Sequence, residues 1–89
     1  MRARIRGKQY RVEFRRALPN SDGHACRLRK EIVVSPRLKG ERKLEVIIHE
    51  LLHICFWDLD ESAIEESASD IARVLTRLGY RDSDLPPPS

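Results

Sequence analysis

The segment 46–55 constrains this chain more than any other, because it has the pattern of an apolar helix that carries two histidines four residues apart. The motif is His-Glu-x-x-His at residues 49–53, with three aliphatic residues before it and Ile54-Cys55 after it. Residues four apart on an α-helix lie on the same stripe. Both imidazoles can therefore reach one metal ion at ~2.0–2.1 Å. The motif alone is only suggestive, and its apolar flanks make it the strongest signal in the sequence.

Glu50 lies between the two histidines in sequence, about 100° further round the helix than His49. This places its carboxylate beside the metal rather than among the metal's ligands. A carboxylate in that position can take a proton from a water molecule that zinc activates. The motif therefore predicts Zn²⁺ as the cofactor, His49 and His53 as metal ligands and Glu50 as the general base.

The length of the chain, 89 residues, indicates one small domain. We expect residues 1–80 to form it and the proline-rich residues 81–89 to be a disordered or extended tail. No apolar run reaches the ~18–20 residues of a membrane span. The basic N-terminus is not followed by the apolar stretch of a secretory signal. Two cysteines do not make a disulfide framework, so we expect a reducing, cytoplasmic setting.

The charge is divided unevenly along the chain. Residues 1–43 hold 14 Lys or Arg against 4 Asp or Glu, and residues 44–89 hold 3 against 10. A basic cluster of this kind can bind nucleic acid. Alternating arginines are also typical of the exposed face of a strand, and this second interpretation is the simpler one.

Three strands are expected in the basic half. Tyr10, Val12 and Phe14 alternate with charged residues, which is the pattern of a strand with one buried face. A turn at Gly7-Lys8 would pair residues 3–6 with 9–16 as a hairpin. Turn-forming residues at 19–23 then break the chain. The β-branched run 31–35, which Pro36 ends, is the third strand.

Two helices are expected in the acidic half. The first should run from about residue 40 to 57, with the histidines pointing away from its apolar face. Residues 58–61 should end it and cap the second helix, which should run from about 60 to 78. The apolar faces are Leu44, Ile47, Ile48, Leu51 and Cys55 in the first helix and Ile64, Ala68, Ile71, Leu75 and Leu78 in the second. The sequence thus predicts an α+β domain with a small three-stranded antiparallel sheet packed on two helices.

A catalytic zinc site usually has three protein ligands, so a third ligand is needed. The acidic side chains of the second helix are Glu61, Glu65, Glu66 and Asp70. A projection at about 100° per residue, with Ile64 at zero, places Glu61 at about 60°, Glu65 at about 100° and Glu66 at about 200°. Glu65 borders the inward face beside two alanines, which leave room for a metal. We expect Glu65 to be the third ligand.

A His-Glu-x-x-His helix followed by a helix with a glutamate resembles the gluzincin-type zinc peptidases, which include thermolysin and the ImmA/IrrE-type peptidases. Residues 31–78 resemble small phage and prophage proteins of this kind. The resemblance implies a minimal zincin-like fold and a zinc metallopeptidase activity, with Glu65 as the downstream ligand. Aligning residues 66–70 on the Glu-x-x-x-Asp of thermolysin would instead make Glu66 the ligand and Asp70 a partner of a zinc histidine. This alternative stays open.

A peptidase also needs a substrate site. The strand at 31–35 is a candidate sheet edge for an extended peptide or protein substrate. Tyr80, Tyr10 and His24 are candidate donors to the oxyanion that forms during hydrolysis. The alternative function is a non-catalytic, zinc-stabilised module that binds nucleic acid or a partner protein through its basic half.

Overall fold

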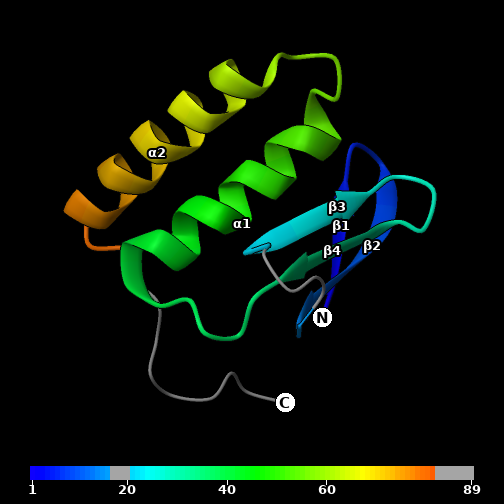
Figure 1. Ribbon diagram of the computed structural model, residues 1–89, viewed down its shortest axis with the longest axis horizontal. Helices are drawn as coiled ribbons and strands as arrows, with labels where there is room; N and C mark the ends of the chain where they lie inside the picture. Colours follow the sequence, from blue (N-terminus) through cyan, green and yellow to red (C-terminus); the bar gives the residue numbers. More distant parts are fainter. Residues whose placement is uncertain (17–20, 82–89) are drawn as a thin grey trace.

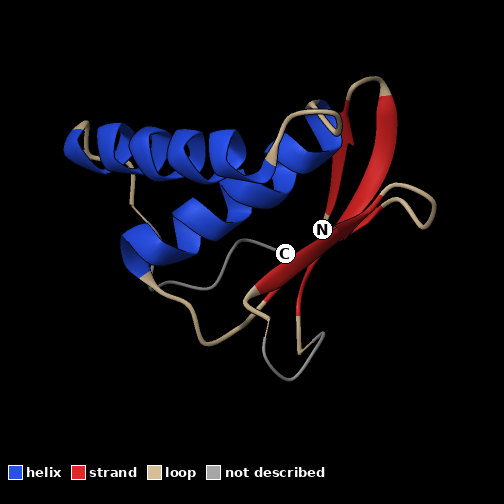
Figure 2. Cartoon of the chain, turned by 45° about the horizontal axis from the view of Figure 1, so that its top comes forward, coloured by secondary structure: helices blue, strands red, loops and turns tan. Residues whose placement is uncertain are grey.

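The chain folds into a four-stranded sheet with both helices on one side of it (Figures 1 and 2). The computed structural model describes residues 1–16 and 21–81. Residues 19 and 20 of the expected turn, and residues 82–89 of the expected tail, lie outside these ranges. The elements are β1 (Arg2–Ile5), β2 (Lys8–Phe14), β3 (Gly23–Cys26), β4 (Glu31–Val34), α1 (Gly40–Cys55) and α2 (Glu61–Arg77).

The sheet has the strand order β1-β2-β4-β3, and its central pair, β2 and β4, is parallel. The α+β class is confirmed, but the predicted three antiparallel strands are wrong in number and in direction. β3 was missed because it is short and contains no β-branched residue, and because its first residue, Gly23, has the character of a turn. β3 forms the far edge, and the chain returns from it to place β4 beside β2.

The predicted hairpin at the start of the chain is confirmed as β1 and β2, which pair in antiparallel fashion from Arg2↔Arg11 to Ile5↔Lys8. Its two turn residues are Arg6 and Gly7, one position earlier than expected. Their φ angles are +50° and +77°. Positive φ at both positions is the requirement of a tight type I′ turn, which matches the twist of the two strands.

The core lies between the sheet and α1. β4 is buried along its whole length, and Ile32 and Val34 face α1. In α1 the most buried residues are Val46, Glu50 and Ile54, which follow one another at intervals of four. The buried cluster consists of Ile5, Tyr10, Val12, Ile32, Val34, Val46 and Ile54, with Ile47, Leu51 and Cys55 packed partly buried around it.

α2 packs on α1 and on no strand of the described residues, so α1 is the middle layer of the molecule (Figure 1). The side of α2 that is buried consists of Ile64, Ala68 and Ala72. The predicted stripe holds for Ile64 and Ala68 but is wrong for Ile71 and Leu78, which are 41% and 68% exposed. Small alanines let the two helices approach closely, so a narrow stripe is enough to hold α2.

None of the described helices combines the length and the apolar character needed to cross a bilayer. Cys26 and Cys55 are both partly buried and carry free thiols. Cys55 packs against the core as a small apolar residue, as its position on the helix predicts.

Candidate metal centre

Three potential metal ligands meet where the last turns of α1 face the first turn of α2. The Nε2 atoms of His49 and His53 lie 3.1 Å apart. Glu61 places Oε1 2.9 Å from Nε2 of His49 and Oε2 3.1 Å from Nε2 of His53. The two imidazoles are partly buried, and the Glu61 side chain is 63% exposed. The centre therefore opens to solvent on the side of α2.

Local structure explains this convergence. The histidines share a stripe of α1 because they are four residues apart. α1 ends with the Phe56 N–H donating to the Leu52 carbonyl at 2.8 Å, and the chain reverses direction over residues 56–60. Asp60 then caps α2 by accepting from the Ala63 N–H at 2.7 Å. Glu61 is the first residue of α2 and lies directly opposite the histidines.

The spacing of these three groups fits a metal ion. Tetrahedral ligands with bonds of ~2.0–2.1 Å lie ~3.3–3.4 Å apart, slightly more than the 2.9–3.1 Å seen here. Without a metal, neutral imidazoles at this distance direct lone pairs at each other unless one nitrogen carries the proton. The carboxylate also presents only acceptors when ionised. His49, His53 and Glu61 could therefore hold a metal ion.

Glu65, the expected third ligand, is not part of this group. It lies one turn further along α2, where it lines a pocket with His49 and Glu50. Glu66 and Asp70 line a neighbouring hollow, between α2 and Glu45 of α1, and Asp70 pairs with Arg73 at 3.1 Å. The turn between the helices is so short that the first residue of α2, not its second turn, stands opposite the histidines. Glu61 thus replaces Glu65 and Glu66 as the candidate ligand.

Glu50 is held on the inner side of α1, against β3. It is 8% exposed. A Cβ placed on Gly23 would lie 3.3 Å from Oε2 of Glu50 and 2.9 Å from the carbonyl oxygen of Val33, so strand and helix are in close contact. Burial raises the pKa of Glu50 from 4.5 to about 7; Glu61 acts in the same direction and His53 opposes it. Glu50 can therefore gain or lose a proton near neutral pH.

A polar pocket of about 230 Å³ lies beside Glu50. Arg42 of α1 bonds to Asp22, just before β3, at 2.7 Å and to Glu45 at 3.1 Å. These ion pairs tie the start of β3 to α1 next to the metal centre. The residues that line the pocket are Ser21, Asp22, Gly23, Arg42, Glu45, Val46, His49, Glu50 and Glu65.

The three candidate oxyanion donors lie elsewhere. Tyr10 is buried in the core at 4% exposure. His24 is on the other face of the sheet, with Nε2 3.7 Å from Oε1 of Glu31. Tyr80 lines a hollow with Gly40, at the opposite end of α1 from His53. The expected substrate edge also changes, because β4 is paired on both sides and β3 is the outer strand.

No protein-family model matches the chain, and the curated proteins and solved structures likewise gave no match. Its function is therefore inferred from the residues described above.

Proposed function

We propose that this protein is a zinc-dependent peptide hydrolase. The observation that carries the proposal is the meeting of His49, His53 and Glu61 beside the buried carboxylate of Glu50. Two imidazoles and one carboxylate form a donor set that suits zinc, and three protein ligands leave a position open, as in catalytic sites. When bound, zinc would supply Lewis-acid chemistry, activating water and polarising a carbonyl group.

Glu50 is the proposed general base. It follows His49 directly, so it is next to the metal ligands without being one of them, and it lines the polar pocket. Its pKa of about 7 suits a group that accepts a proton from water and returns it to the leaving amine at neutral pH. We place this activity in a reducing, cytoplasmic setting as part of the proposal, since two cysteines do not make a disulfide framework.

β3 is the proposed docking edge for the substrate. It is the outermost strand beside α1, and an extended peptide could add to it as a further strand. Gly23 brings this strand against Glu50, so the peptide would pass the general base. Arg27 stacks over Trp57 at 4.7 Å, which joins the β3–β4 turn to the turn between the helices. Phe56 and Trp57, 51% and 58% exposed, offer an apolar surface beside His53.

A zinc-stabilised module without catalysis is the second candidate. It is favoured by the packing of α2, which contacts α1 alone among the described elements. The three ligands come from these two helices, so a metal would link them and stabilise the pair. Glu50 distinguishes the two functions, because only hydrolysis needs its carboxylate.

The decisive experiment compares Glu50→Gln with the parent protein after both are loaded with zinc. We expect Glu50→Gln to lower kcat/KM on a peptide library by ~10²–10⁴-fold, measured by mass spectrometry, while zinc content measured by elemental analysis is unchanged. His53→Ala is the matched loss-of-metal control and should lose both zinc and hydrolysis. Hydrolysis that survives Glu50→Gln, or a zinc-loaded parent that cleaves no peptide, contradicts the proposal.

A further inference from the structure

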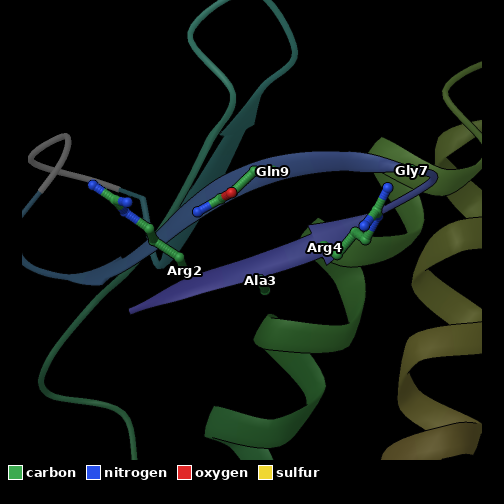
Figure 3. A pocket seen from close by; sticks show the side chains of 5 residues that line it. All are labelled: Arg2, Ala3, Arg4, Gly7 and Gln9. Atoms are coloured by element: carbon green, nitrogen blue, oxygen red, sulfur yellow. The ribbon is translucent and has the colours of Figure 1, made fainter.

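No described helix or strand packs on the face of the sheet that points away from the helices, which we call the open face (Figure 2). Ala3, Ile5, Tyr10 and Val12 of β1 and β2 pack toward α1. Side chains alternate along a strand, so the residues between them point to the open face. Figure 3 shows this arrangement, with Arg2, Arg4 and Gln9 on the side of the strands opposite Ala3. The arginines of β1 and β2, which are Arg2, Arg4 and Arg11, are thus gathered on one surface.

A hollow of about 360 Å³ lies on this part of the sheet (Figure 3). Its lining residues include Arg2, Arg4 and Gln9, whose side chains end in guanidinium and amide groups. Gly7 at its end has no side chain to fill it. Guanidinium and amide N–H groups are the donors that phosphate oxygens prefer. The hollow therefore has the size and the chemistry to take a phosphate group.

The positive charge of this layer is only partly compensated by its own carboxylates. Residues 1–34 hold ten Lys or Arg against three Asp or Glu, whereas residues 40–81 hold five against nine. Arg11 of β2 and Arg15, just after β2, reach Glu31 at 3.3 and 3.4 Å. Arg2 and Arg4 form no ion pair or side-chain hydrogen bond within the described residues. An anion would therefore meet two arginines with free donors.

The register of β1 and β2 also favours an anion on this face. Arg2 is directly opposite Arg11 in the antiparallel pair. Like charges at such a position destabilise a sheet. Glu31 and Glu13 already offset the charge of Arg11, so a bound anion beside Arg2 would remove the repulsion that remains.

We propose that this open face binds the phosphate backbone of nucleic acid, independently of sequence. Protein interfaces need an apolar centre, but the strand residues here are mainly charged and the aliphatic Val33 is fully buried. Evenly spaced phosphates match a surface of several cations. Among the described strand residues of this face there is no Phe, Tyr or Trp to stack on a base, so recognition would not depend on base identity. The metal centre lies on the other side of the sheet and stays accessible.

The test measures fluorescence anisotropy of labelled ~20-nucleotide DNA, single-stranded and duplex, between ~50 and ~200 mM salt. The double variant Arg2→Ala/Arg4→Ala should weaken binding by about tenfold or more and reduce the slope of log affinity against log salt by about 2. Arg73→Ala/Arg77→Ala on α2 is the matched control, with the same charge change, and should bind like the parent. Arg2→Lys/Arg4→Lys should keep most of the affinity, because charge is what phosphate requires.

Several outcomes overturn the proposal. The first is that the parent protein does not bind DNA, and the second is that the two double-alanine variants lose DNA affinity equally. The third is that the protein binds phosphatidylserine vesicles strongly and does not bind DNA. His53→Ala should bind DNA like the parent, so a failure of the metal centre and a failure of this surface can be told apart. Circular dichroism of each variant checks that the sheet is folded.

Discussion

The two sides of the sheet each bury one glutamate, and the two glutamates are held in opposite ways. Glu31, on the open face, is 3% exposed and contacts Arg11 and Arg15. Glu50, on the helix side, is 8% exposed and has its pKa raised by burial. A buried charge is tolerated when it is paired. On the open face, two arginines thus neutralise the buried carboxylate of Glu31. At the metal centre, burial of the Glu50 carboxylate lowers the stability of the fold, and shifted pKa values of this kind are typical of catalytic sites.

The largest effect that separates the two sides should come from the ligand on α2. Glu61→Ala should weaken zinc binding by ~100-fold or more, because it removes one of three ligands, whereas Glu65→Ala should change it by less than ~10-fold. Competition with a chromophoric chelator measures both constants. DNA binding should stay unchanged in both variants, since neither residue is on the open face.

The opposite ranking, with Glu65→Ala the more damaging change, would restore Glu65 as the third ligand. The two variants are well matched, because both remove one exposed carboxylate from the same helix.

Local features of the site could be predicted from the sequence, and features set by the meeting of distant segments could not. His49, Glu50 and His53 are fixed by the geometry of one helix, so their relative positions follow from spacing alone. The choice between Glu61 and Glu65 depends on how sharply the chain reverses after Cys55. Helical projection already put Glu61 nearer the inward face, but Glu65 was preferred because the alanines beside it leave room for a metal.

The same division applies to the fold. The hairpin of β1 and β2 is local, and its turn carries a glycine, so it was predicted correctly. The parallel pairing of β2 with β4 joins segments about 20 residues apart. The residue pattern of a strand does not indicate which other strand it pairs with, so this pairing could not be predicted. β3 is held by its pairing with β4 and its packing on α1, not by residues of high strand propensity.

The second prediction compares the buried glutamates in metal-free protein. The pKa of Glu50 is about 7 in the folded protein against an ordinary 4.5, so between these values the folded protein keeps a proton that the unfolded chain has lost. Its contribution to the free energy of unfolding therefore falls as pH rises from about 4.5 to about 7. Glu50→Gln should raise the free energy of unfolding at pH ~8 by up to about 3 kcal/mol and change little at pH ~5.

Glu31→Gln is the counterpart on the open face. It removes the partner of Arg11 and Arg15, so it should lower the free energy of unfolding by about 1–3 kcal/mol. Urea denaturation at the two pH values measures both variants. If Glu50→Gln were destabilising at pH ~8, the carboxylate would have to be paired, and the contrast between the two sides would be lost.

The last contrast concerns the close contact of Gly23 in β3 with α1 and β4, beside Glu50. In Gly23→Ala the new Cβ would lie 2.9 Å from the carbonyl oxygen of Val33 and 3.0 Å from Cγ1 of Val46. The first of these is a backbone atom of β4, which cannot rotate away, so α1 or β3 must shift. We expect the free energy of unfolding to fall by about 1–3 kcal/mol, measured by urea denaturation. DNA affinity should stay at the parent value because Arg2 and Arg4 lie on β1, the strand at the other edge of the sheet. A variant as stable as the parent would mean that β3 can move away from α1, and Glu50 would then not be held against the proposed substrate edge.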